Sequence, residues 1–444
     1  MTTRPNKAEY LEAPSLHWPP PRTGSTVLRL EGLDPWHAAA RVGDLFDRRL
    51  LWAGDGGRTR FSALGERCRV SFDELRNATA TAAEEFELPA AAARQLPLGL
   101  FVLGETDERP AAFECGEGET RPHCWTPQAL LIADGNSSLL YCADPSLRRN
   151  LLQRLEAATP SSPSRVAASC APEIHETPLD SQDTWANRVD RALVEIRQGN
   201  LEKLVVSRRL VFQPSGGLFS PWESTWQASR ASGRIGFSIS LDRGKSMFVG
   251  ATPETLLKIQ DGSVRTHALA GTRERDASLE DFLVSSKLAR EHTLVSDGLV
   301  ARLGPLVSNI RPGPLRVRRS GLVSHLETPL SGDLREGVDP LQILADLHPT
   351  AAIGGLPQRA AQAALRDIEP YSRGWFAAPF GWLAANGNLH AGIAIRSVWV
   401  SGERAVALAG AGIVEGSVAA EEWAETESKF DNMRAVVRGH RFGA

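Results

Sequence analysis

Two acidic segments contain side chains of the kind that binds a divalent metal ion. One segment, KLAREH, contains Glu291, and the other, EEWAETESK, contains Glu422, Glu425 and Lys429. The spacing of three and then four residues in the second segment places all three side chains on one face of a helix. Carboxylates that project from two helices offer the hard oxygen ligands that Mg²⁺ prefers. The same spacing is also typical of a solvated, salt-bridged helix surface, so it indicates a metal site only together with other signals.

Two further ionisable residues stand at the ends of apolar strands. Lys203 begins the run KLVVS, where burial would favour the neutral amine that a general base requires. Glu254 follows the turn GATP, where partial burial would raise its pKa and suit it to act as a general acid. Each residue also has an ordinary structural interpretation. Lys203 could extend from a strand end to solvent, and Glu254 could occupy the first turn of a helix.

A third group of residues could hold an anionic substrate. Arg396 lies in an otherwise apolar strand, and a buried arginine needs a partner because an unpaired buried charge costs several kcal/mol. A structural ion pair and a substrate carboxylate are both consistent with this position. Gly410 and Gly412 would allow backbone N–H groups to approach an anion closely. We expect His325 to form hydrogen bonds within the core or a pocket.

Hydrophobic periodicity indicates the elements that position these residues. We expect helices over residues 144–158, 185–198, 281–303, 341–347 and 358–367. We expect strands over residues 98–103, 129–132, 204–207, 235–241, 246–250, 376–383, 389–400 and 405–410. A linker or long surface loop is expected over about residues 157–184. Many antiparallel strands with helices on their outer faces favour an α+β layered sandwich.

Composition excludes several classes of function. The chain has 444 residues, 42% of them hydrophobic, and a net charge of -3, so there is no basic field that would attract nucleic acid. No apolar run reaches the ~18 residues that a membrane span needs. The five cysteines are scattered and form no C-x-x-C pair, which favours a reducing compartment and argues against a zinc site. We therefore expect a cytoplasmic protein without nucleic-acid or membrane partners.

The order of these motifs resembles that of the chorismate-binding enzymes. This family includes isochorismate and salicylate synthases and the large subunits of anthranilate and aminodeoxychorismate synthases. The matching segments are KLVVSR (203–208), GATPE (250–254), ALAGTR (268–273), KLAREH (287–292), HLET (325–328), LHPT (347–350), RGWFAAPFGW (373–382), IRS (395–397) and AGAGI (409–413). The resemblance covers about residues 185–437.

This resemblance implies a fold and a set of residue roles. The implied fold is a layered α/β/β/α sandwich of two stacked antiparallel sheets clad by helices, as in anthranilate synthase component I. Residues 1–180 would form its divergent N-terminal portion and residues 181–444 its catalytic portion. Chorismate and Mg²⁺ would bind between the layers, with Lys203 as the base that activates water and Glu254 as the acid. The metal ligands would be Glu291 and Glu425, with Glu422 acting through water, and the substrate would be bound by Thr272, His325, Arg396, Gly412 and Lys429.

Within the family, the sequence favours an isochorismate synthase, which adds water at C2 of chorismate and releases the C4 hydroxyl. Ala270 stands where some aminodeoxychorismate synthases carry a nucleophilic lysine, and Ala352 stands where ammonia-using anthranilate synthases typically have threonine. We therefore expect no glutamine amidotransferase subunit. We also expect a monomer, although neither residue bears on the oligomeric state. Two alternatives stay open: a salicylate synthase, which goes on to expel pyruvate, and a catalytically weak chorismate-binding protein. Menaquinone and siderophore synthesis are both open as destinations of the product.

Two positions depart from the family's pattern. Leu288, one helical turn before Glu291, replaces a residue that is usually acidic, and Phe376 replaces a tyrosine. Loss of the acidic group predicts weak Mg²⁺ affinity, which Leu288→Glu would improve. The alternative is that Leu288 packs against the core, in which case the same substitution would bury a charge.

Overall fold

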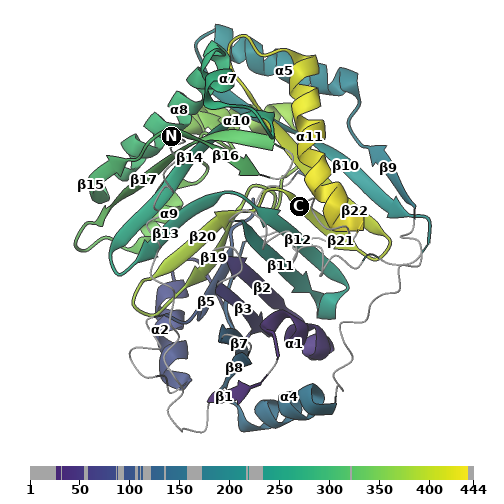
Figure 1. Cartoon of the computed structure of the whole chain (residues 1–444), viewed down its shortest axis with the longest axis vertical. Helices are drawn as coiled ribbons and strands as arrows, with labels where there is room; N and C mark the ends of the chain where they lie inside the picture. The colour runs from purple at the N-terminus through teal and green to yellow at the C-terminus, as the bar shows by residue number, and fades with distance from the viewer. Residues whose placement is uncertain are drawn as a thin grey trace, which may run out of the picture.

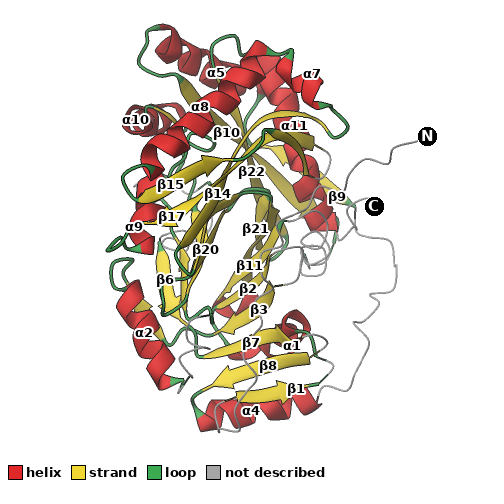
Figure 2. Ribbon diagram, turned by 60° about the vertical axis from the view of Figure 1, so that its left-hand side comes forward, coloured by secondary structure: helices red, strands yellow, loops and turns green. Residues whose placement is uncertain are grey.

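Two large antiparallel sheets, stacked face to face and clad by helices, form the structure (Figure 1; Figure 2). This computed structural model describes residues 27–438, apart from residues 32, 55–58, 87, 89–94, 106–108, 111, 114–121, 135–136, 158–172, 217–218, 220–233 and 321–322. The arrangement confirms the predicted α/β/β/α sandwich. Within the described ranges, no helix is long and apolar enough to cross a membrane.

The first sheet combines strands from both ends of the sequence. Its spatial order is β1 (Val27–Leu30), β8 (Ser137–Cys142), β7 (Ala129–Asp134), β3 (Thr59–Leu64), β2 (Arg49–Gly54), β11 (Ile235–Leu241), β12 (Ser246–Thr252), β21 (Ser397–Ser401), β22 (Arg404–Ile413), β10 (Lys203–Pro214) and β18 (Gly355–Leu356). A further strand, β9 (Ile174–Pro178), also pairs with β10. Because β2 pairs with β11, the predicted N-terminal and catalytic portions share one sheet.

The second sheet is also mixed in origin. Its spatial order is β15 (Val307–Pro312), β17 (Val323–Leu334), β14 (Ser263–Glu274), β13 (Thr255–Gln260), β20 (Leu389–Ile393), β19 (Pro379–Leu383), β5 (Gly99–Val102), β6 (His123–Thr126) and β4 (Cys68–Val70), and β16 (Arg316–Ser320) pairs with β17. Aromatic side chains join the two sheets. The rings of Phe237 on β11 and Phe380 on β19 lie 4.1 Å apart between their centroids.

Helices cover the outer faces of both sheets. The described helices are α1 (Pro35–Val42), α2 (Leu75–Glu85), α4 (Pro145–Ala157), α5 (Gln182–Arg197), α7 (Leu279–Leu283), α8 (Ser286–Leu303), α9 (Pro340–Leu347), α10 (Gln358–Ile368) and α11 (Ala419–Arg438), with short 3-10 turns η1 (Gly43–Leu45) and η3 (Asp242–Gly244). Apolar side chains of α5, α10 and α11 pack on β10 and β22. Helix α8 lies against β14 of the second sheet.

Two predicted elements are each divided in the structure. The expected strand 389–400 is two strands in different sheets, β20 and β21, and Arg396 between them has a left-handed backbone with φ of 54°. This conformation turns the chain from one sheet to the other. The expected helix 281–303 is two helices, because the Ser285 side chain accepts from the N–H of Leu288 and begins a new helix there.

The predicted linker is wrong where the structure describes it. Residues 158–172 lie outside the described residues, but 174–178 form β9, and α5 begins at Gln182. The polar composition of this stretch suggested a loop. Strand β9 is nevertheless held by antiparallel pairing with β10, and most of its residues are exposed. Polar side chains are therefore compatible with a strand at this position.

Candidate active site

Every predicted site residue except Glu422 lines one cavity of about 60 Å³. Residues from both sheets and from two helices line it. The first sheet supplies Lys203 (β10), Gly412 (β22) and, after β12, Glu254. The second sheet supplies Thr272 (β14) and His325 (β17), the β20–β21 connection supplies Arg396, and the helices supply Glu291 (α8), Glu425 and Lys429 (both α11). Residues far apart in the sequence are thus brought together where the two sheets meet α8 and α11.

Lys203 is buried in this cavity. Side chains alternate along β10, so Leu204 and Val206 pack outward in the cluster formed with α5, whereas Lys203 and Val205 line the cavity. The Nζ of Lys203 donates to Oε1 of Glu291 at 2.9 Å, and only 1% of the residue is exposed. The interpretation of Lys203 as a lysine that extends to solvent is therefore wrong.

Gly412 provides the space that the Lys203–Glu291 pair occupies. It lies opposite Val205 in the β10–β22 ladder. A Cβ atom at this position would stand 2.3 Å from Oε1 of Glu291 and 2.9 Å from Cε of Lys203. Any side chain would therefore displace the ion pair.

We expect Gly412→Ala to lower turnover by about 100-fold, because a displacement of about 1 Å at reacting groups has effects of this size. A steady-state assay of turnover measures the loss. The matched control is Gly298→Ala on α8, whose added Cβ meets only ordinary contacts at 3.8 Å. Equal activity of the two variants would show that Gly412 does not control the position of the pair.

Glu254 has the environment of a proton donor. It lies between β12 and β13 rather than in a helix, so the first-turn interpretation is wrong. Only 6% of the residue is exposed. Burial raises the pKa of its carboxyl to about 7, against the opposing effect of the positive charges of Arg396 and Lys203. A large fraction of Glu254 is therefore protonated at neutral pH, as a general acid requires.

Arg396 is a buried cation that makes no direct ion pair among the described residues. Its Nε has no hydrogen-bond partner, and the carboxylates of Glu425 and Glu254 act on its charge without forming an ion pair with it. Its Nη2 lies 3.5 Å from Nε2 of His325, and the Nδ1 of His325 lies 3.1 Å from the carbonyl oxygen of Gly271. Burial and the charge of Arg396 hold the pKa of His325 well below its usual value, so this ring is neutral. An anionic ligand would supply the charge that Arg396 lacks.

Each of the three predicted metal-binding carboxylates accepts a hydrogen bond from a lysine. Lys203 pairs with Glu291, Lys287 pairs with Glu422, and Lys429 pairs with Glu425 at 2.6 Å. The other polar contacts of the Glu425 pair are from Thr272 Oγ1 to Glu425 Oε1 at 3.2 Å and from Lys429 Nζ to the carbonyl of Gly410 at 2.7 Å. The three acidic charges are therefore balanced by three basic ones.

The carboxylate oxygens of Glu291 and Glu425 are suitable ligands for a Mg²⁺ ion, which is usually held by one or two carboxylates together with substrate oxygens and waters. Across the described ranges, no three His, Cys, Asp or Glu side chains gather around one point. Glu422 does not line the cavity and is 1% exposed. Its burial, with the charge of Glu425, raises the pKa of the Glu422 carboxyl. Any contribution of Glu422 to metal binding would be indirect.

The sequence interpretation missed Lys287 as the ion-pair partner of Glu422. It lies four residues before Glu291 on α8, and its side chain reaches Glu422 on α11. The spacing of Lys287 and Glu291 by one helical turn was a possible signal. The pairing of Lys287 with Glu422 on α11 had no signal in the sequence, because it depends on how α8 and α11 pack.

The two departures from the family's pattern lie outside the cavity lining. Leu288 is 7% exposed and packs with Phe282 and Leu326, against the backbone at Gly271. Phe376 lines a separate cavity of about 260 Å³. The packing of Leu288 supports the alternative that it is a core residue.

Leu288→Glu is therefore expected to destabilise the fold by about 3 kcal/mol or more, because it buries an uncompensated charge. It should not improve Mg²⁺ affinity. Thermal unfolding and calorimetric Mg²⁺ titration check both effects. Leu283→Glu is the matched control, since Leu283 on the neighbouring α7 is 51% exposed. Tighter Mg²⁺ binding by Leu288→Glu would contradict this expectation.

The chain belongs to the chorismate binding enzyme family, which matches residues 122–438. It is 32% identical over 269 residues to isochorismate synthase MenF of Bacillus subtilis, covering 59% of this chain and 56% of that protein. It is 35% identical over 263 residues to the salicylate biosynthesis isochorismate synthase of Pseudomonas aeruginosa, covering 57% and 54%. The matches thus span little more than half the length of these relatives.

A solved structure extends the likeness of fold to almost the whole chain. The structure of MenF, the menaquinone-specific isochorismate synthase of Escherichia coli, superposes with a TM-score of 0.72 and covers 93% of this chain and 94% of its own. The sequence identity is 22%, so this comparison shows the fold.

Proposed function

We propose that this protein is an isochorismate synthase, which converts chorismate to isochorismate. The observation that carries the proposal is the buried Arg396, which makes no direct ion pair with a described carboxylate, in the same cavity as Lys203 and Glu254. This cavity offers a cation for a substrate carboxylate, a base and an acid together. The named activities of the Bacillus subtilis and Pseudomonas aeruginosa relatives support the same reaction.

Binding depends on two cations and one hydroxyl. Arg396 would neutralise one carboxylate of chorismate, and the Lys429 amine would approach the other. Thr272 would donate its hydroxyl hydrogen to a substrate oxygen, a bond that it now makes to Glu425 at 3.2 Å. The neutral His325 ring supports Arg396 without competing for an anion. Chorismate carries two carboxylates, so a site with several cations suits it.

Two proton transfers complete the isomerisation. Lys203 would leave Glu291, release its ammonium proton to solvent and, as the neutral amine, take a proton from the water that attacks C2. The ring double bonds shift, and the C4 hydroxyl leaves as water after Glu254 protonates it. One water is consumed and one released, so the net reaction is an isomerisation. Both groups lie in a cavity largely shielded from solvent, where such transfers are effective.

Mg²⁺ held by Glu291 and Glu425, with Glu422 supporting it through water, would orient the ring carboxylate and neutralise its charge. Glu291 and Glu425 reach the cavity from α8 and α11, so the spacing of these helices determines the spacing of the two carboxylates. The Lys287–Glu422 pair joins the same two helices.

The test is incubation of the protein with chorismate and Mg²⁺, followed by chromatography for isochorismate, salicylate and pyruvate. Isochorismate without pyruvate supports the proposal. Salicylate and pyruvate in equal amounts would identify a salicylate synthase instead. A chorismate-dependent rise in melting temperature without any product would identify a binding protein.

The proposal also concerns the nucleophile, the need for a second subunit, the oligomeric state and the location of the protein. We propose that water is the nucleophile, so neither ammonia nor a glutamine amidotransferase subunit should change the product. Ala352 in the cavity lining supports this proposal, because it adds no polar group that would hold ammonia. A monomeric state and a cytoplasmic location remain predictions.

A further inference from the structure

A buried ion pair lies behind one wall of the active-site cavity. The guanidinium of Arg373 donates to both carboxylate oxygens of Glu369, from Nε at 2.8 Å and from Nη2 at 2.7 Å. Arg373 is 4% exposed and Glu369 is 1% exposed. Neither residue lines the cavity that contains Lys203. This two-point geometry fixes the plane of the guanidinium.

The same guanidinium also holds two backbone segments. Its Nη1 donates to the carbonyl of Ile353 at 2.8 Å, and its Nη2 donates to the carbonyl of Val205 at 2.6 Å. Val205 lines the cavity, and so does Ala352, the neighbour of Ile353. Arg373 thus contacts both segments that form this wall without facing the cavity itself.

The two segments are also joined to each other beside Lys203. The N–H of Val205 donates to the carbonyl of Gly354 at 2.8 Å, and β18 pairs with the start of β10, with Leu356 opposite Lys203. Arg373 therefore completes a small unit of hydrogen-bonded backbone. The position of Lys203 depends on this unit, because Lys203 is the first residue of β10.

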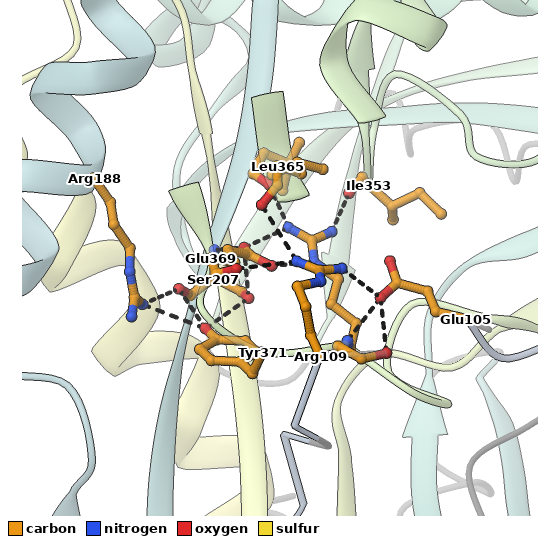
Figure 3. Close-up of polar contacts among 11 residues, drawn as sticks. Glu105, Arg109, Arg188, Ser207, Ile353, Leu365, Glu369 and Tyr371 are labelled. Atoms are coloured by element: carbon orange, nitrogen blue, oxygen red, sulfur yellow. Dashed lines mark hydrogen bonds and ion pairs between the residues drawn. The ribbon is translucent and has the colours of Figure 1, made fainter. Parts of the chain in front are cut away.

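Further contacts anchor Glu369 and the backbone of Arg373, as Figure 3 shows around Ser207, Glu369 and Glu105. Oε1 of Glu369 accepts from the N–H of Ser207 at 2.7 Å and from its hydroxyl at 2.8 Å. Oε2 of Glu105 accepts from the N–H of Arg373 at 2.8 Å. Glu105 belongs to the predicted N-terminal portion, so this portion helps to hold the wall of the catalytic cavity.

We propose that Arg373 is a positioning residue of the active site. It fixes the wall formed by β10 and residues 352–356, and thereby fixes the Lys203 amine relative to the nucleophilic water. A planar guanidinium with several N–H donors can serve the Glu369 carboxylate and both carbonyls at once, whereas an ammonium group cannot reproduce that fork. The inference rests on the proposed function only for its kinetic test.

The chain offers a matched control in Arg188. This arginine is 3% exposed, pairs with Asp180 at 2.6 Å, and donates to the carbonyl of Ser207 on the same strand β10. Its partners, Asp180, Ser207 and Tyr371, do not line the cavity. Arg188→Met therefore removes an equally buried guanidinium that donates to neither the Val205 nor the Ile353 carbonyl.

The experiment compares Arg373→Met, Arg373→Lys and Arg188→Met with the unmodified protein. We expect both Arg373 variants to lose about 10–100-fold in kcat, with KM for chorismate changed by less than about 3-fold, because Arg396 and Lys429 still bind the substrate. Arg188→Met should keep kcat within about 3-fold of the unmodified protein, even if its melting temperature falls as much as that of the Arg373 variants. Equal losses of kcat in the Arg188 and Arg373 variants would overturn the proposal.

A second measurement does not depend on turnover. Amide hydrogen exchange should show faster exchange across residues 203–206 and 353–356 in the Arg373 variants, and unchanged protection there in Arg188→Met. If Arg373→Met does not fold, Glu105→Gln is measured instead, with faster exchange expected at residues 372–374 and 353–356. Unchanged exchange in these segments would sink the positioning role. Failure of the unmodified protein to convert chorismate would sink the proposed activity alone.

Discussion

Replacement of Glu254 by glutamine is expected to abolish turnover and, at the same time, to stabilise the folded protein above pH 7. The amide cannot protonate the leaving hydroxyl, so we expect a loss of at least about 100-fold, the lower part of the range for general acid catalysis. The stabilisation has a separate cause, because the buried carboxyl of Glu254 must ionise in a place that disfavours its charge.

The sign of the pH effect follows from the direction of the shift. Burial raises the pKa of Glu254 from 4.5 to about 7, so the folded protein binds this proton more tightly than the unfolded chain. Stability is therefore lost as the pH rises from about 4.5 to 7 and stays lower above that range. Each unit corresponds to about 1.4 kcal/mol, which makes the penalty on the order of 3 kcal/mol. Glu254→Gln removes it.

Denaturant unfolding at pH 5 and pH 8 measures this difference, with the exposed Glu403→Gln as the control. The stability advantage of Glu254→Gln should be small at pH 5 and large at pH 8. Turnover of the unmodified protein should decline above pH 7 as Glu254 ionises. A Glu254→Gln variant that is active, or one whose advantage does not grow with pH, would contradict the assignment.

Replacement of Glu291 or Glu425 by glutamine is expected to remove Mg²⁺-dependent turnover, by at least about 100-fold, because a neutral amide is a poor ligand for a hard cation. Their effects on stability should differ. Glu291→Gln leaves the buried Lys203 without a carboxylate and should cost about 3–5 kcal/mol. Glu425→Gln should cost less, because Lys429 keeps its hydrogen bond to the carbonyl of Gly410.

Calorimetric Mg²⁺ titration and thermal unfolding separate loss of metal from loss of fold. The double variant Lys203→Met with Glu291→Gln is the matched control, since it removes both charges of the pair and should recover stability without recovering turnover. Near-normal Mg²⁺-dependent turnover in either single variant would remove that residue from the direct ligands.

The sequence predicted the location of the site better than the path of the chain through it. Lys203 and Glu254 were candidates because each stands at the end of an apolar strand, and the order of the motifs, which resembles the chorismate-binding enzymes, selected them over their structural interpretations; both line the cavity. The bend at Arg396 was not identifiable, because the apolar run 389–400 continues through it. A left-handed backbone is signalled by glycine or asparagine, and arginine gives no such signal.

Other features of the structure were not predicted from the sequence, for similar physical reasons. The helix break at Ser285 could have been predicted, since serine is a preferred N-cap residue and its side chain accepts a hydrogen bond from the N–H of Leu288. The burial of Glu422 away from the cavity could not, because it depends on Lys287 from another helix. The contribution of Glu105 was equally hidden, since its partner at Arg373 lies in the other half of the sequence.

The shared sheets make the two halves of the sequence a single unit of folding. Strand β11 pairs on one side with β2, far earlier in the sequence, with Phe237 opposite Trp52, and β19 pairs in the same way with β5. Pairings between such distant segments form late, since a long loop must close before they contribute. Residues 181–444 carry all the motifs of the active site, yet alone they would present bare strand edges at β11 and β19, the kind of surface that recruits other chains and aggregates. The chemistry is encoded in one portion of the chain, whereas we expect its solubility to depend on both.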